Sequence, residues 1–213
     1  VKPTFGLVPR TGVLKTCDPL DTIGFMTKDI SNASEILRAI SLTGNNYPKN
    51  KFIEDKEPNL CIVGYFDIEE ISSVVNVSSS MVSAYNQTIL KLKDSGVNVL
   101  KLEIPDFFKN VHKSHEIIYS KSLEYYFKNE LELTDDVSES FKEFVNRGSV
   151  WSSNDFMKEQ RNQLKNIQTF SSFVDKSNVD FILSPAVHGV APMLEEEELN
   201  DLSLLWTYLH CPS

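Results

Sequence analysis

The 213-residue sequence has no long hydrophobic run and no excess of positive charge. No stretch approaches the ~20 consecutive apolar residues of a membrane-spanning helix, so we expect no membrane partner. Lys and Arg number 21 against 30 Asp and Glu, which gives a formal net charge of -9. Nonspecific nucleic-acid binding needs basic surface to displace counterions, so this balance predicts no nucleic-acid partner.

Cysteine is also scarce. The three cysteines, Cys17, Cys61 and Cys211, form no closely spaced pair of the kind that holds zinc. So few cysteines, odd in number, favour a reducing compartment, and we predict a cytoplasmic location. Cys61 stands in the apolar run 60–63 and is predicted to be a buried strand residue.

What is present is ordinary for a globular protein. Hydrophobic residues make up 41% of the chain and charged residues 24%, and the length is enough to bury a sizeable core. Pro3, Gly6, Pro9 and Gly12 punctuate the start so closely that it must be a shaped loop. Helical spacing then begins near residue 28 and reaches residue 40, with Asp29 or Ser31 as candidate N-caps.

A βαβ unit is the clearest structural prediction. Residues 60–66 form a short apolar run typical of a strand buried on both faces. A helix follows from Ser78-Ser79-Ser80 and ends near Gly96, and residues 97–104 form the next strand. A strand, a helix and a strand at this spacing predict that the two strands are parallel.

The remaining pattern is mostly helical. Helices are predicted over 107–131, over 134–145 with a cap at Ser138 and a break at Gly148, and from an N-cap in 153–155 to at least residue 173. Residues 179–183 form a third strand, and a last helix begins near residue 202. The polar stretch 44–58 is interpreted as an exposed connection, and the acidic run 195–198 as a solvated segment.

Two pieces of the N-terminal loop carry a resemblance to a known family. Residues 2–12, Lys-Pro-Thr-Phe-Gly-Leu-Val-Pro-Arg-Thr-Gly, and residues 18–27, Asp-Pro-Leu-Asp-Thr-Ile-Gly-Phe-Met-Thr, resemble the amidase signature family of serine amide hydrolases. Fatty acid amide hydrolase, bacterial amidases and the glutamyl-tRNA amidotransferase component that carries the amidase signature belong to that family. The resemblance implies an α/β fold, with a mixed β-sheet covered by helices, and no cofactor. It extends more weakly along the chain to Val-Asp-Phe-Ile-Leu-Ser-Pro at 179–185.

The resemblance also implies hydrolysis of carboxamide carbon–nitrogen bonds through an acyl-serine intermediate. The family uses a serine, a second serine and a lysine, and its Gly/Ser-rich segment precedes the Lys-Pro-Thr piece. None of these positions matches a residue in this chain, so we assign no catalytic residue. We expect residues 1–213 to be the central part of one amidase-like domain, inactive alone, with the N-terminal lysine/serine part and the C-terminal tail outside it.

Two other functions remain open. The chain can be a non-catalytic binding module that keeps the fold, or an amidotransferase subunit that passes ammonia to a partner. The expected partners are a small-molecule amide substrate and either a second copy in a homodimer or a partner subunit. If the chain is a fragment, its sheet edges and one apolar face are expected to lie uncovered.

Several polar residues have simple structural explanations. The serines at 78–80 lack a Gly-rich elbow, and helix capping accounts for them better than nucleophilic catalysis. His112 and His115 share a helix face, but Lys113 between them would repel a cation, so we predict no metal site. Asp21 is predicted to hold the loop by accepting hydrogen bonds from its N–H groups, in preference to touching substrate.

Three residues are our candidates for substrate binding. Arg161 falls near the place where some members of the resembling family have a residue that meets the substrate's carboxylate. Tyr119 and Trp151, the other two candidates, are aromatic positions that could line a substrate channel. Trp206 is a third aromatic position of this kind but is not one of the three candidates. Ordinary packing is the favoured explanation for each of these aromatic side chains.

Overall fold

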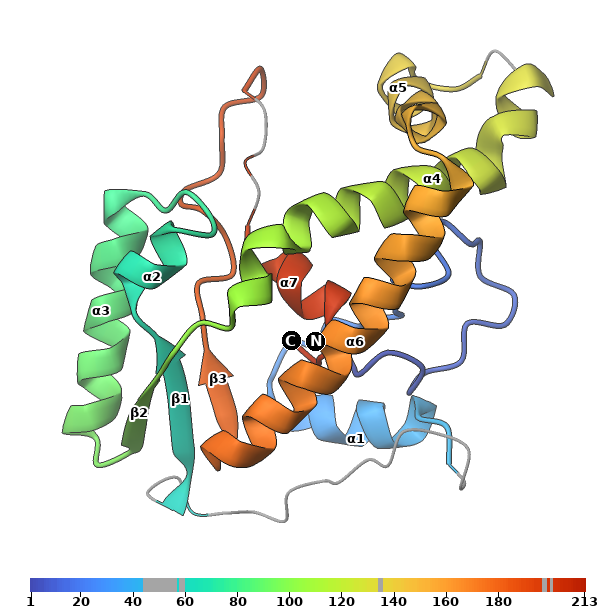
Figure 1. Ribbon diagram of the computed structural model, residues 1–213. Helices are drawn as coiled ribbons and strands as arrows, with labels where there is room; N and C mark the ends of the chain where they lie inside the picture. Colours follow the sequence, from blue (N-terminus) through green and yellow to red (C-terminus); the bar gives the residue numbers. More distant parts are fainter. Residues whose placement is uncertain (44–56, 58–59, 134–135, 197–198, 200) are drawn as a thin grey trace. The chain divides into compact units, whose positions relative to one another are not determined.

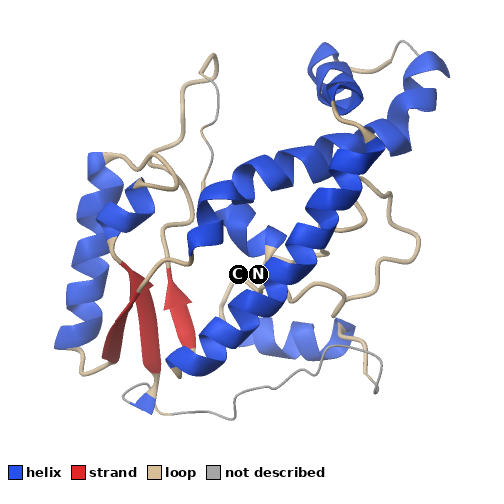
Figure 2. Cartoon of the chain, in the orientation of Figure 1, coloured by secondary structure: helices blue, strands red, loops and turns tan. Residues whose placement is uncertain are grey.

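The computed structural model describes residues 1–43, 57, 60–133, 136–196, 199 and 201–213. The predicted connection over 44–58 therefore lies outside the described residues, apart from Glu57. Helices and strands along the chain are shown in Figures 1 and 2. In order they are α1 (Ser31–Ile40), β1 (Ile62–Phe66), α2 (Ile68–Ser72), α3 (Ser79–Asp94), β2 (Asn98–Leu102), the 3-10 helix η2 (Asp106–Asn110), α4 (Val111–Leu133), α5 (Glu139–Arg147), η3 (Gly148–Val150), α6 (Ser153–Ser177), β3 (Phe181–Leu183) and α7 (Ser203–Tyr208).

The chain divides into two compact units. Unit 1 consists of residues 1–50, 113–165 and 206–213, and unit 2 consists of residues 51–112 and 166–205. The boundaries fall inside α4, α6 and α7, so each of these helices contributes residues to both units.

Unit 2 contains a parallel sheet with the strand order β2-β1-β3. Val63 at the centre of β1 stands opposite Val99 of β2 on one side and Phe181 of β3 on the other. The predicted βαβ unit and the α/β fold class are confirmed. The expected sheet was mixed, whereas every strand pair among the described residues is parallel.

Polar contacts within unit 2 fix the register of this sheet. The Asp180 carboxylate accepts a hydrogen bond from the Ile62 N–H at 2.8 Å, and the Asp180 N–H donates to the Ile62 carbonyl at 2.8 Å. At the other end of the strands, the Tyr85 hydroxyl lies 3.0 Å from the Phe66 carbonyl and 3.0 Å from the Leu183 carbonyl. Burial raises the pKa of this phenol, so it stays protonated and ties α3 to β1 and β3.

The strands are less buried than their sequences indicated. Within β1 only Gly64 and Phe66 are buried, and Leu100 in β2 is 44% exposed. Cys61 precedes β1 and is half-buried, so its prediction as a buried strand residue is wrong. The core of unit 2 instead gathers around Phe66, whose ring meets the edge of the Phe108 ring at 5.5 Å.

The helix N-caps were predicted from the local sequence for some helices and missed for others. Ser78 accepts from the Met81 N–H and Ser138 from the Phe141 N–H, as predicted. The cap of α6 is Ser152, one residue before the predicted segment, which exchanges hydrogen bonds with Asp155. The predicted caps of α1 are wrong, because α1 begins after Ile30 without a side-chain cap bond.

Unit 1 packs the N-terminal loop against α4, the first part of α6 and the last residues of the chain. The Val1 amino group donates to the Phe25 carbonyl at 2.9 Å, and the Ser213 N–H donates to the Lys2 carbonyl at 2.8 Å. The first two residues therefore run between the end of the loop and the end of the chain. Leu7, Cys17 and Leu20 from the loop are buried in the core of this unit.

None of the helices in the described ranges has both the length and the apolar character needed to span a bilayer. All three cysteines are free thiols: Cys17 is buried, and Cys61 and Cys211 are half-buried. Burial raises the pKa of Cys17 to about 12 and that of Cys211 to about 11.

Candidate functional site

The carboxylate of Asp21 organises the N-terminal loop of unit 1. Its Oδ2 accepts from the N–H groups of Thr16 at 3.0 Å and Cys17 at 2.9 Å. Its Oδ1 accepts from the Thr16 hydroxyl at 2.6 Å, and the Arg10 guanidinium lies 3.9 Å from Oδ2. The predicted role of Asp21 in satisfying loop N–H groups is confirmed.

Asp18 connects the same loop to α4. The Tyr126 hydroxyl donates to its carboxylate at 2.7 Å, Lys15 approaches at 3.0 Å and Arg10 at 3.5 Å. The Tyr126 hydrogen bond, helped by Lys15, lowers the pKa of Asp18. The same hydrogen bond raises the pKa of Tyr126 to about 12, so the phenol stays a proton donor at neutral pH.

Pro19 joins the loop to α6 and to the end of the chain. Its carbonyl accepts from His210 Nε2 at 2.8 Å when the imidazole carries its proton there. The His210 ring stacks on Phe5 at a centroid distance of 3.9 Å, and Gln163 donates to the Tyr208 carbonyl at 3.0 Å. Burial lowers the pKa of His210, so these contacts hold a neutral imidazole.

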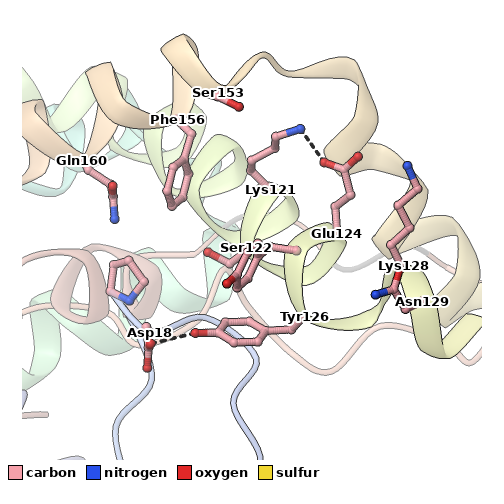
Figure 3. Close-up of a pocket in the computed structure, with 12 residues that line it drawn as sticks. Asp18, Lys121, Ser122, Glu124, Tyr126, Lys128, Asn129, Ser153, Phe156 and Gln160 are labelled. Carbon is pink, nitrogen blue, oxygen red and sulfur yellow. Dashed lines mark hydrogen bonds and ion pairs between the residues drawn. The ribbon is translucent and has the colours of Figure 1, made fainter.

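A cavity of about 640 Å³ opens beside this framework, between α4 and the start of α6 (Figure 3). Asp18 and Pro19 of the N-terminal loop line it, and Phe156 and Gln160 reach in from α6. From α4 it is lined by Lys121, Ser122, Glu124, Tyr125, Tyr126, Lys128 and Asn129, and Ser153 completes the rim. Lys121 forms an ion pair with Glu124.

A shallower groove of about 540 Å³ shares Asp18, Pro19 and Gln160 with this cavity. Arg161 lines this groove, together with Met157, Leu164, Gln163, Phe5 and His210. The exposed Arg161 side chain donates through Nε to the Met157 carbonyl at 3.2 Å, one turn earlier on α6. Of our three substrate-binding candidates, only Arg161 is among the residues that line this cavity or this groove.

The aromatic candidates lie elsewhere in unit 1. Tyr119 is half-buried on α4 and stacks on His115 at 5.8 Å, and burial raises the pKa of its phenol. Trp151 is half-buried in the turn after η3, where its backbone N–H donates to the Gly148 carbonyl. Trp206 is 8% exposed and belongs to the core.

The residues that line the cavity were not identified from the sequence. Tyr125, Tyr126 and Phe156 stand in helical patterns that resemble ordinary packing. A tyrosine pair on the polar side of a helix at 125–126 was the available signal, because a solvated face seldom needs two adjacent aromatic side chains. These side chains come close to Asp18 only through contacts between residues far apart in the sequence.

The other polar candidates have structural partners. Ser78 caps α3, as described above. His112 Nε2 lies 2.8 Å from the Asp201 carbonyl, and His115 stacks on Tyr119. Within the described ranges, no group of three or more His, Cys, Asp or Glu side chains is placed to hold a metal ion.

Comparison with known proteins gives the family. The model of the Amidase family matches residues 1–213, the whole of the sequence. The chain therefore belongs to the Amidase family. Its resemblance to amidase signature proteins, first seen in residues 2–27, is confirmed.

Curated relatives include components of glutamyl-tRNA(Gln) amidotransferases. The chain is similar to such a component from Brachyspira hyodysenteriae, with 29% identity over 118 residues that cover 50% of this chain and 23% of that protein. The mitochondrial counterpart from Yarrowia lipolytica is 22% identical over 269 residues, covering 99% of this chain and 55% of that protein. The chain thus spans between about a quarter and about half of the length of these relatives.

Solved structures show the same fold. A crystal structure of an amidase matches 98% of this chain and 48% of its own, with a TM-score of 0.76 and 16% identity. Fatty acid amide hydrolase matches 98% of this chain and 39% of its own, with a TM-score of 0.73 and 18% identity. The structure of a glutamyl-tRNA(Gln) amidotransferase subunit from Thermotoga maritima matches 98% of this chain and 46% of its own, with a TM-score of 0.61 and 19% identity.

Proposed function

We propose that the protein to which this chain belongs cleaves carboxamide carbon–nitrogen bonds through an acyl-serine intermediate. The match of the Amidase family to residues 1–213 carries this proposal. In the reaction, a serine oxygen attacks the amide carbonyl carbon, the carbon–nitrogen bond breaks, and ammonia or an amine leaves with a proton. Water then attacks the ester, which releases the carboxylic acid and restores the serine.

Residues 1–213 would serve this reaction as a wall of the substrate site. The hydrogen bonds of Asp21 and Asp18 hold the N-terminal loop in one shape, and preorganised walls orient a substrate at low entropic cost. We propose Arg161, Tyr119 and Trp151 as substrate contacts in the complete site. Arg161 is supported by its exposed position on the groove beside Pro19.

The 213-residue chain alone should be inactive, because none of its residues matches the serine and lysine positions that the family uses. We also propose a cytoplasmic location, which the three free cysteines support.

A second function is favoured by the curated relatives. Those described above are subunits of a glutamyl-tRNA(Gln) amidotransferase, so the ammonia released could pass to a partner subunit instead of to solvent. A non-catalytic module that keeps the fold is the third candidate. These alternatives differ in one observable, which is the fate of the amide nitrogen.

Ammonia release from a panel of primary carboxamides tests the proposal. The panel should contain glutamine, benzamide and aliphatic amides, and the full gene product should be compared with the 213-residue chain. We expect the gene product to release ammonia and the 213-residue chain to release none. Ammonia formation that requires a co-purifying protein would favour the amidotransferase. If the gene product leaves every amide intact, with or without co-purifying proteins, the catalytic proposal is wrong.

A further inference from the structure

The cavity between α4 and α6 in unit 1 has aromatic side chains from both helices in its wall. Tyr125, Tyr126, Phe156 and Pro19 all line it. The Tyr125 and Tyr126 rings meet edge to face at 5.1 Å, and Tyr125 is 81% exposed although it is a large apolar side chain. The volume of about 640 Å³ lies within the roughly 300–1,000 Å³ that small-molecule sites occupy.

Most of the charged side chains around the cavity already have partners in the protein. Lys121 is paired with Glu124, and Asp18 is held by Tyr126, Lys15 and Arg10. The opposite charges of these groups offset each other within the cavity wall, so they offer little unpaired charge to a ligand.

Lys128 is different. Within the described part of the chain it makes no ion pair, and neither its neighbour Asn129 nor Gln160 makes a side-chain hydrogen bond. Lys128 and Asn129 lie together at one end of the cavity, while Gln160 points into it from α6 (Figure 3). Aromatic walls with available cationic and amide donors at one end fit a ligand that has a flat apolar body and an anionic or carbonyl acceptor.

We propose that this cavity binds the aromatic end of an amide substrate, with a carboxylate of that substrate received by Lys128 and Asn129. The ligand class is thus an aromatic amide that also carries a carboxylate. The identification of the ligand as substrate rests on the proposed amide-cleaving function. The binding of such a molecule in the cavity is independent of that function, because we infer it from the residues of unit 1 that line the cavity.

Direct binding to the full 213-residue chain tests the site without any catalytic step. Isothermal titration calorimetry would compare N-benzoylglycine, which has the ring and the carboxylate, with two matched probes. N-benzoylglycinamide keeps the ring but is neutral, and N-acetylglycine keeps the carboxylate but has no ring. We expect N-benzoylglycine to bind about three- to tenfold more tightly than its amide, the size of a partly exposed charge-assisted contact. N-acetylglycine should bind most weakly.

Two variants locate the contacts. Lys128→Met should remove the preference for N-benzoylglycine over its neutral amide while leaving the amide's own affinity unchanged. Tyr125→Leu should weaken both ring-bearing probes by a similar factor, and because Tyr125 is so exposed the variant should fold as the wild type does. Lys113→Met, an exposed lysine on α4 away from the cavity, is the matched charge control and should change nothing.

The outcomes separate this inference from the proposed function. Probes that fail to bind, or whose binding is unaffected by Lys128→Met and Tyr125→Leu, would overturn the cavity assignment even if the gene product cleaves amides. Binding with the expected order, in a gene product that cleaves no amide, would support the cavity as a ligand site and overturn its role in catalysis.

Discussion

Asp21 is the residue on which the shape of the N-terminal loop depends most directly. Asp21→Asn keeps the size of the side chain but removes its charge and replaces one acceptor oxygen with a donor. The N–H groups of Thr16 and Cys17 share the Oδ2 acceptor, so part of this bonding is lost. We expect the free energy of unfolding in urea to fall by about 1–3 kcal/mol.

Asp29→Asn provides the control for this change. Asp29 is exposed, and the contact that the structure gives it is through its backbone carbonyl, so its replacement should leave stability within error. Equal effects of the two substitutions would contradict the assigned role of Asp21.

His210 gives the molecule a predictable dependence on pH. Burial lowers its pKa in the folded chain, and the positive charges of Lys2 and Arg10 act in the same direction. The unfolded chain, with a histidine pKa near 6.5, therefore binds the proton more readily. The contribution of neutral His210 is fully present above about pH 6.5 and is lost as the pH falls below it.

Unfolding measured between pH 8 and pH 5 checks this expectation. The stability of the wild-type chain should fall over that interval, and His210→Gln should flatten the curve in the same window. Asp18 acts at lower pH: its contribution is present above the usual pKa of a carboxylate and is lost as the pH falls from that value through the lowered pKa of the folded chain. An unchanged pH curve in His210→Gln would show that another group titrates.

At the scale of elements, Gly148 is required by packing as well as by its position between helices. The sequence predicts a helix break there, but φ is negative and the backbone is accessible to any residue. An added Cβ would lie 2.3 Å from the Ser120 carbonyl oxygen and 2.6 Å from Glu124 Cβ on α4. Gly148→Ala should therefore lower the free energy of unfolding by about 1–3 kcal/mol.

Val150→Ala in the same turn is the matched control, because Val150 is 76% exposed. Thermal unfolding of the two variants should separate close packing against α4 from a general effect of changing the turn. Equal melting temperatures for the two would mean that α4 moves away without cost.

The start of α6 depends on a reciprocal pair of hydrogen bonds. The Asp155 N–H donates to the Ser152 hydroxyl at 3.1 Å, and the Ser152 N–H donates to the Asp155 carboxylate at 3.0 Å. Ser152→Ala should cost about 0.5–2 kcal/mol of stability in chemical denaturation. Asn154→Ala, exposed and outside this pair, should cost less, and a reversal of that order would refute the cap.

The elements that the sequence predicts well are those governed by neighbours in the chain. Ser78 and Ser138 cap their helices, and Gly96 ends α3 with a positive φ of 78°, because each feature involves a few adjacent residues. The pairing of β3 with β1 and the meeting of Tyr126 with Asp18 join residues about a hundred positions apart. No local pattern specifies such contacts, so the cavity could not be predicted.

At the scale of the whole molecule, the family likeness was predictable and the location of the site was not. Residues 2–27 carry a motif that needs no folding to be recognised. Arg161 was chosen on the same resemblance, and it lines a groove with Pro19 of that motif. Its contact with substrate stays a prediction.

Labelling with a fluorophosphonate serine probe, followed by intact mass and peptide mapping, shows whether the gene product has a nucleophilic serine and where that serine lies. The full gene product and the 213-residue chain, of 24.2 kDa, should be treated side by side. We predict one adduct on the gene product, at a serine outside residues 1–213, and none on the 213-residue chain. An adduct on a serine within residues 1–213, or none on either protein, would contradict this prediction.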